Sequence, residues 1–165
     1  MSDYAPKSRV DDFSDGWCIT SGSNRYKYAR ARDAFQSIPI RDNRSGMTES
    51  NAFSMCEDYL GNLWIVGWDS GVFCYNKSTG RFRNYLTSNG KPLLKGRIHT
   101  IREIDPGLFM LGSDSGLTCL EPATGAYFTY SFPHHLQRSL SDNLVSDVWL
   151  DRERVPGLAH CFARG

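Results

Sequence analysis

The sequence lacks both a long apolar run and an excess of charge of one sign. It has 165 residues, with 19 Lys and Arg against 18 Asp and Glu and a net charge of +1. No stretch approaches the roughly 18 apolar residues of a membrane helix. The basic residues are scattered, so neither nucleic acid nor an anionic membrane is indicated as a partner. The hydrophobic content of 40% is typical of one ordinary soluble domain.

An apolar signal-peptide core is also missing from the N-terminal stretch MSDYAPKSRVDD. As written, the chain is therefore expected to stay where it is made, in the cytoplasm or at an unknown location.

Metal-binding and redox spacings are absent too. None of the five cysteines forms a C-x-x-C pair, and four of them replace apolar residues in strand-like runs, which is typical of buried, inert thiols. A disulfide or a metal role is the alternative. The cysteines are Cys18, Cys56, Cys74, Cys119 and Cys161.

The histidines show no H-x-x-x-H or H-E pattern. His134 and His135 are adjacent, and neighbouring side chains on an extended segment point to opposite sides, so they form a poor chelate. We therefore predict neither a metal site nor a cofactor.

No nucleophile motif accompanies the two Asp-Ser-Gly triplets, at 69–71 and 114–116. Neither has the G-x-S-x-G order of a nucleophile elbow, and both recur where a hairpin turn is expected. We interpret Ser70 and Ser115 as turn residues. The carboxylates Glu57, Asp58 and Glu103 recur at strand ends, where they are expected to accept hydrogen bonds from turn N–H groups.

What the sequence does contain is an internal repeat. A shift of 45 residues places Gly67 on Gly112, Gly71 on Gly116, Cys74 on Cys119 and Trp64 on Phe109. A shift of 47 residues places Trp17 on Trp64 and Phe35 on Phe82, which marks an earlier, more divergent copy. VSDVWLD at 145–151 matches AFSMCED at 52–58 and opens a further copy.

Within a copy, short aromatic and β-branched runs alternate with turn residues, which indicates strands. The clearest copy predicts four strands, at 52–57, 62–67, 71–75 and 81–86. Four short antiparallel strands recurring about every 45 residues indicate a β-propeller blade, whose two apolar faces must be covered by neighbouring blades. Trp17, Trp64 and Phe109 would fill the gaps between blades.

The pattern E-D-x-x-G-N-L-W-I-x-G, followed by G-V-F-C-Y-N-K-S-T-G-R-F-x-x-Y, resembles the two-component regulator propeller repeat. This resemblance implies the periplasmic sensor region of a bacterial hybrid histidine kinase or a related signalling protein, which passes a ligand signal across the membrane. No kinase or cyclase motif is present, so this chain is not expected to be an enzyme. The family's Gly-Thr pair is replaced by Gly67-Trp68 and Gly112-Ser113, so no role of that threonine is carried over.

The predicted fold is all-β, a partial β-propeller of about three four-stranded antiparallel blades with an incomplete fourth. After Asp151 the repeat pattern is lost in RERVPGLAHCFARG, which we interpret as the end of a gene fragment or a shifted reading frame. The expected units are a first blade and its connection at 1–50, a second blade at 51–97, a third at 98–142, the first strand of a fourth at 143–151, and a non-propeller tail at 152–165.

Propeller geometry also predicts where a ligand would bind. The connections between blades and the loops joining second and third strands lie on one face. Trp68 beside Asp69 is the favoured pair, because a flat aromatic ring stacks on a sugar while a carboxylate accepts hydroxyl protons. A Trp that only covers a blade edge is the structural alternative. Asp114, Arg97 and His99 are expected near the same rim.

Three functions are consistent with these patterns. The first is non-catalytic sensing of a small molecule such as an oligosaccharide, by a fragment of a sensor whose parent is periplasmic. The second is a fragment of a propeller hydrolase or lyase acting on a glycan, and the third is a protein-interaction propeller. A row of about three and a half blades has an open apolar face at each end. The remaining blades or another copy of the chain would cover these faces, so the isolated chain is expected to self-associate.

Overall fold

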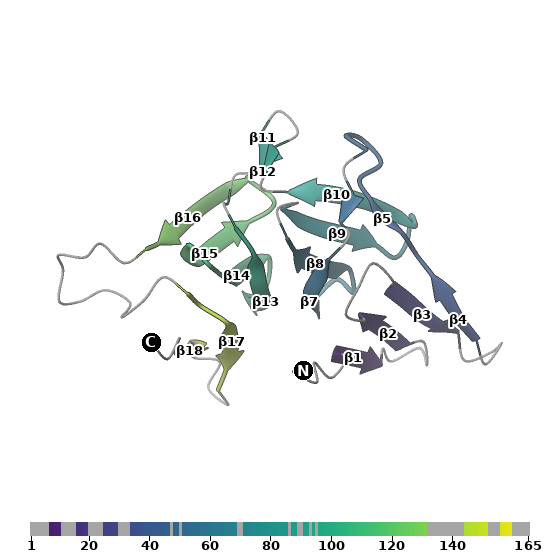
Figure 1. Cartoon of the computed structure of the whole chain (residues 1–165), viewed down its shortest axis with the longest axis horizontal. Coiled ribbons are helices and arrows are strands. Elements are labelled where there is room, and N and C mark those ends of the chain that lie inside the picture. Colours follow the sequence, from purple (N-terminus) through teal and green to yellow (C-terminus); the bar gives the residue numbers. More distant parts are fainter. Residues whose placement is uncertain are drawn as a thin grey trace.

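The structure is a computed structural model, and every segment that it describes is strand or turn (Figure 1). The described residues are 7–10, 16–19, 25–29, 34–46, 48–49, 51–68, 71–85, 87–88, 91–92, 94, 96–131, 144–151 and 156–159. Side chains are described from residue 34 onward, except those of residues 49, 87–88, 91–92 and 158–159. No described residue lies in a helix long and apolar enough to cross a membrane.

Three four-stranded antiparallel sheets follow one another along the chain. The first contains β1 (Lys7–Val10), β2 (Gly16–Ile19), β3 (Arg25–Ala29) and β4 (Ala34–Ser37). The second contains β7 (Ala52–Glu57), β8 (Leu63–Gly67), β9 (Val72–Asn76) and β10 (Arg81–Tyr85). The third contains β13 (Ile98–Asp105), β14 (Leu108–Ser113), β15 (Gly116–Glu121) and β16 (Ala126–Tyr130).

Three two-stranded ladders complete the described structure. They are β5 (Ile40–Arg41) with β6 (Thr48–Glu49), β11 (Thr87–Ser88) with β12 (Lys91–Pro92), and β17 (Asp147–Leu150) with β18 (Pro156–Ala159).

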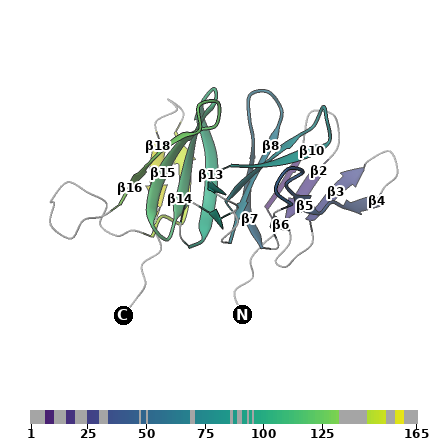
Figure 2. The same cartoon turned by 90° about the horizontal axis from the view of Figure 1, so that it is seen from above.

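The sheets are arranged as successive blades of a propeller. In each sheet the strands follow one another in sequence order. The first strands of successive sheets lie together, since β7 contacts β13 and β13 contacts β17. Figure 2, at right angles to Figure 1, shows the sheets standing side by side. The predicted all-β, partial-propeller fold is confirmed, and the four strands predicted for the second blade agree with β7 to β10 to within one residue at each end.

The C-terminal segment differs from expectation. The sequence predicts a non-propeller tail at 152–165, and part of this segment forms β18, which pairs with β17, with Val148 opposite Leu158. The fourth sheet therefore has at least two strands. Gly157 permits this pairing, because a Cβ there would lie 2.4 Å from Cε2 of Trp149, whose ring lies against the glycine.

Two aromatic residues fill the space between the second and third blades. Trp64 on β8 and Phe109 on β14 have ring centroids 4.4 Å apart and are only 4% and 1% exposed. They belong to one apolar cluster with residues of both sheets, including Val72 and Ile101. Both rings thus lie where the repeat predicts an aromatic between blades. Trp17 occupies the matching second strand, β2, but its side chain lies outside the described residues.

Two of the three acidic residues expected to accept turn N–H groups, Asp58 and Glu103, do so, whereas Glu57 accepts a hydrogen bond from Nζ of Lys77 at 2.9 Å. Asp58 Oδ1 accepts hydrogen bonds from the backbone N–H groups of Leu60 and Asn62. Its Oδ2 accepts the indole N–H of Trp64 at 2.9 Å. Glu103 accepts the N–H of Gly107 from its own turn and, through its other oxygen, the N–H of Tyr59 from the preceding blade.

Two repeat glycines are needed for close packing. A Cβ on Gly112 would lie 2.6 Å from the carbonyl oxygen of Val145, where the third blade meets the fourth. Gly116 has φ +122°, and a Cβ there would lie 2.1 Å from the carbonyl oxygen of Tyr130. Both positions therefore exclude any side chain.

The outer edge of the second blade is covered by the turn after β5. Asn43 donates its N–H to the carbonyl of Phe82 and accepts the N–H of Phe82 on its side-chain oxygen. Asp42 is buried and accepts the N–H groups of Arg44 and Ser45, which closes the turn. The backbone N–H of Asn84 also donates to Asp42.

Three cysteines have described side chains, and they differ in burial. Cys56 and Cys74 are buried and Cys119 is half-buried. Burial raises the pKa of Cys74 to about 12, with the nearby charge of Asp58 adding to this rise, so the thiol is neutral at physiological pH. Cys18 and Cys161 fall among residues whose side chains are not described.

Candidate functional site

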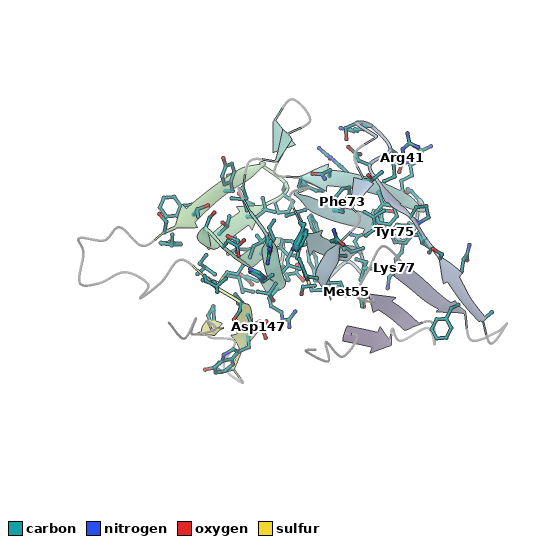
Figure 3. All side chains as sticks on the ribbon, viewed as in Figure 1. Arg41, Met55, Phe73, Tyr75, Lys77 and Asp147 are labelled. Carbon is teal, nitrogen blue, oxygen red and sulfur yellow. The ribbon has the colours of Figure 1, made fainter. Side chains whose placement is uncertain are left out.

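Two β-bulges aim side chains at one end of the inner strands. The register of β7 skips Phe53 between Ala52 and Ser54, and the register of β13 skips His99 between Ile98 and Thr100. Phe53 and His99 are thus matching residues of successive blades, and their ring centroids are 6.0 Å apart (the side chains of this region are drawn in Figure 3). A bulge commonly redirects a side chain in this way next to a functional site.

Arg97 joins the hairpin ends of the second and third blades. Its backbone N–H donates to Asp114 Oδ2 at 3.1 Å, and its carbonyl accepts the N–H of Asp114 at 3.1 Å. It also forms an isolated antiparallel bridge with Trp68. The preceding Gly96 lies so close that a Cβ there would be 3.0 Å from Asp114 Oδ2. The connection between the two blades is therefore held against both hairpins.

Trp68 provides the aromatic surface of this cluster. The Arg97 guanidinium lies 4.4 Å from the centroid of its ring, a cation–π distance. Phe53 packs against it at 5.8 Å between centroids, tilted by 51°. The backbone N–H of Trp68 donates to the carbonyl of Asn51, yet 38% of the residue remains exposed. An indole is thus held in place with part of its surface open to solvent.

Asp114 supplies the negative charge. Its Oδ1 lies 2.6 Å from Nε2 of His99, and the His99 and Asp114 side chains are 20% and 41% exposed. Burial alone would raise the pKa of Asp114. The hydrogen bonds from His99 and from the Arg97 N–H, together with the charges of both residues, outweigh that effect and lower the pKa below its usual value. Asp114 is therefore ionised at neutral pH.

The structure brings together four of the five residues predicted for the site. Trp68, Arg97, His99 and Asp114 form one connected group of contacts. Asp69 lies outside the described residues. Phe53 was missed by sequence reasoning, because the bulge that directs its side chain toward Trp68 leaves no signal in the repeat spacing.

The cluster combines an exposed aromatic ring, a guanidinium and an ionised carboxylate within one surface. Such a set is suited to hold a polar molecule that has a flat apolar side and hydroxyl groups. Among the described residues, no three His, Cys, Asp or Glu side chains gather as they would around a metal ion. The histidine pair 134–135 and His160 lie outside the described residues.

The fold and the position of this cluster define a β-propeller segment with a candidate ligand site on the face where blade connections and hairpins meet. Among solved structures, the chain is similar to the extracellular domain of the hybrid two-component system BT4673 of B. thetaiotaomicron, with a TM-score of 0.74 and 21% identity over 92% of this chain. A second structure of that domain, there described as a one-component system, gives a TM-score of 0.75 at 20% identity over 93% of this chain.

The extracellular domain of the hybrid two-component system BT3049 of the same organism gives a TM-score of 0.71 at 16% identity over 88% of this chain. The chain spans only about a fifth of these structures, between 19% and 20% of their length. No family model and no curated protein matches the sequence. At these identities the similarity establishes the propeller fold.

Proposed function

We propose that the chain forms part of the ligand-sensing propeller of an extracytoplasmic receptor in bacterial signal transduction, and that it binds a small molecule such as an oligosaccharide without transforming it. Two of the solved structures that share its fold are extracellular domains of hybrid two-component systems. The parent protein would accordingly be periplasmic.

The observation that carries the proposal is the contact of Arg97 with both Trp68 and Asp114. Arg97 lies on the connection between two blades, whereas Trp68 ends a strand of one blade and Asp114 lies in a hairpin of the other. A sugar stacked on Trp68 and hydrogen-bonded to Asp114 would touch both blades at once. Its binding would favour one packing of the two blades over another, which is what a sensor requires.

The alternative of a glycan hydrolase or lyase requires a carboxyl group able to donate a proton. Asp114 is held ionised by its hydrogen bonds, because these lower its pKa. Asp147, on the inner strand of the fourth sheet, accepts the hydroxyl of Thr100 at 2.9 Å and lies 3.8 Å from the Arg102 guanidinium. Both carboxylates are thus engaged as acceptors, which favours recognition over acid catalysis.

The test is ligand binding by the full chain. A panel of neutral oligosaccharides, including gluco-, galacto-, xylo- and arabino-oligosaccharides of two to six units, would be screened by saturation-transfer NMR and by tryptophan fluorescence. For a sugar that binds, we expect Trp68→Ala to weaken binding by about tenfold or more, since loss of one aromatic stacking contact removes roughly 1–2 kcal/mol. Asp114→Asn is expected to weaken binding as well.

Trp149→Ala serves as the matched control, because Trp149 is also exposed but lies on β17, outside the cluster. Saturable binding that is lost in Trp68→Ala and retained in Trp149→Ala supports the proposal. Release of cleaved sugar on prolonged incubation contradicts it, and so does binding that is equally sensitive to both substitutions.

A further inference from the structure

A hollow of about 390 Å³ opens beside the outer strands of the second blade. It shares no residue with the hairpin-end cluster, which consists of Phe53, Trp68, Arg97, His99 and Asp114. Cys74 on β9 and Tyr85 on β10 line it, and both also pack with the apolar cluster between the second and third blades. The rest of the lining comes from β9, β10, the hairpin between them and the turn that follows β5. Figure 1 shows β5 and β10 close together at the outer end of this blade.

Three arginines surround this hollow. Arg81 and Arg83 are two residues apart on β10, so their side chains lie on the same face of the sheet, and Arg44 comes from the turn after β5. No carboxylate is among the residues that line the hollow. Within the described part of the chain, none of the three guanidinium groups forms an ion pair with a carboxylate.

The two asparagines that line the hollow, Asn43 and Asn76, also offer hydrogen-bond donors. The side-chain oxygen of Asn43 accepts the backbone N–H of Phe82 at 2.8 Å, and that of Asn76 accepts the N–H of Thr79 at 2.8 Å. These bonds identify which amide atom is the oxygen in each case, because a backbone N–H requires an acceptor. Each asparagine therefore keeps its NH₂ group as a donor beside the arginines.

The cationic groups are held by the surrounding structure. Asp42 accepts two backbone N–H groups of the turn that carries Arg44, and Asn43 bonds that turn to β10. The Arg83 guanidinium lies 4.9 Å from the centroid of the Tyr85 ring, which limits its freedom. The hollow is thus rich in positioned donors and poor in acceptors, an arrangement suited to an anion.

We propose that this hollow binds a small organic anion, with a sulfate, phosphate or carboxylate group on a body of about one sugar residue, through Arg44, Arg81 and the asparagine amides. The oxyanion lies among the guanidinium groups, and the body of the molecule packs on Tyr85. This site is separate from the hairpin-end cluster, so its existence does not depend on the sensing function proposed above.

The experiment measures binding of four probes to the full chain by calorimetry and by ¹H–¹⁵N chemical-shift perturbation. The probes are glucose 6-sulfate, glucose 6-phosphate, glucuronate and, as the neutral control, glucose. We expect at least one anionic probe to bind saturably, glucose not to bind, and affinity to fall with added salt. The ranking of the three anions distinguishes a sulfated, a phosphorylated and a carboxylated ligand.

Arg44→Gln and Arg81→Gln are each expected to weaken binding by about threefold to tenfold, because each removes a charge-assisted donor. Arg41→Gln is the matched control, since Arg41 is exposed, carries the same charge and does not line the hollow. Thermal melting of each variant shows whether it is folded, and a substitution that unfolds the chain is replaced by Lys at the same position.

If Arg41→Gln weakened anion binding as much as Arg44→Gln and Arg81→Gln do, the proposal would be overturned. That result would show that the anions respond to the net charge of the protein and not to a specific site. Failure of all three anions to saturate would also overturn the proposal. Either result leaves binding of neutral sugars at Trp68 unaffected, so failure here and failure of the proposed function are distinguishable.

Discussion

Trp64 and Phe109 pack ring against ring at equivalent positions of successive blades, with centroids 4.4 Å apart. Tyr85 adds a third ring, 5.0 Å from Trp64. Because each sheet is only one layer thick, this contact is where the second and third blades stabilise each other.

Phe109→Ala should therefore destabilise both blades together. We expect the free energy of unfolding to fall by about 3–5 kcal/mol, the usual effect of deleting a buried aromatic ring. Urea titration followed by tryptophan fluorescence and circular dichroism measures it. Phe128→Ala is the control, because Phe128 is 61% exposed and its loss should cost less than about 1 kcal/mol. Equal losses in the two variants would contradict the inter-blade role.

The carboxylate of Asp58 connects a turn to the core. Asp58→Ala leaves the buried indole N–H of Trp64 without its acceptor and removes the acceptor of two turn N–H groups. We expect a loss of about 2–4 kcal/mol, since each buried unsatisfied donor costs about 1–3 kcal/mol. A double-mutant cycle with Trp64→Phe measures the indole bond alone. Additive effects of the two substitutions would show that this bond contributes nothing.

Acid should weaken the hairpin-end cluster through Asp114. Its pKa is lowered in the folded protein, so the stability that it contributes is present above its unfolded pKa and is lost as the pH falls through the lowered folded value. Urea titrations from neutral pH into the acid range should show a steeper acid loss in the wild type than in Asp114→Asn. Asp42→Asn provides a comparison, because hydrogen bonds also outweigh burial and lower the pKa of Asp42. Parallel pH profiles for the wild type and Asp114→Asn would contradict the pairing with His99.

Gly116 should tolerate no side chain. Gly116→Ala places a methyl group 2.1 Å from the Tyr130 carbonyl oxygen, so β15 and β16 must separate. Gly125→Ala is the matched control, because Gly125 also has a positive φ, +74°, but nothing lies within 4 Å of the place that a methyl group would take there. We expect the control to lose about 1 kcal/mol from backbone strain alone and Gly116→Ala to lose several times more. Thermal melting compares them, and similar midpoints would contradict the close approach.

The exposed aromatics of β16 should promote self-association of the isolated chain. Phe128 and Tyr130 contact each other edge to face, 4.7 Å between centroids, and both are largely exposed. Contiguous exposed apolar surface of this kind favours association. Analytical ultracentrifugation should show concentration-dependent oligomers that decrease in the double variant Phe128→Ser, Tyr130→Ser. A monomer at all concentrations would contradict this prediction.

The fold could be predicted from the sequence because each residue type that recurs in the repeat has a definite structural role. Glycines that exclude a Cβ, acids that accept turn N–H groups and an aromatic in each second strand recur at shifts of 45 and 47 residues, so one copy helps to interpret the next. The strand β18 could not be predicted in this way, since Pro156–Ala159 does not continue the repeat pattern, although Gly157 leaves room for the Trp149 ring.

The candidate site could be predicted in part for the same reason. Trp68, Arg97, His99 and Asp114 were expected on one rim from the topology of propeller loops, whereas their mutual contacts depend on bulges that no spacing reveals. Phe53 is the clearest example, because its side chain reaches Trp68 only through the extra residue in β7. The arginine-lined hollow was missed because Arg44 approaches β10 through a turn that lies outside the repeat.

The hydrogen bonds that join the turn after β5 to strand β10 also bear on how the chain would self-associate. Phe82 and Asn84 are the residues through which a foreign strand would add to the outer edge of the second blade, and Asn43 and Asp42 already occupy their backbone groups. Recruitment of strands at that edge is blocked. Self-association of the chain is therefore disfavoured at the outer edge of the second blade, which leaves the exposed aromatic surface of β16 as the expected route.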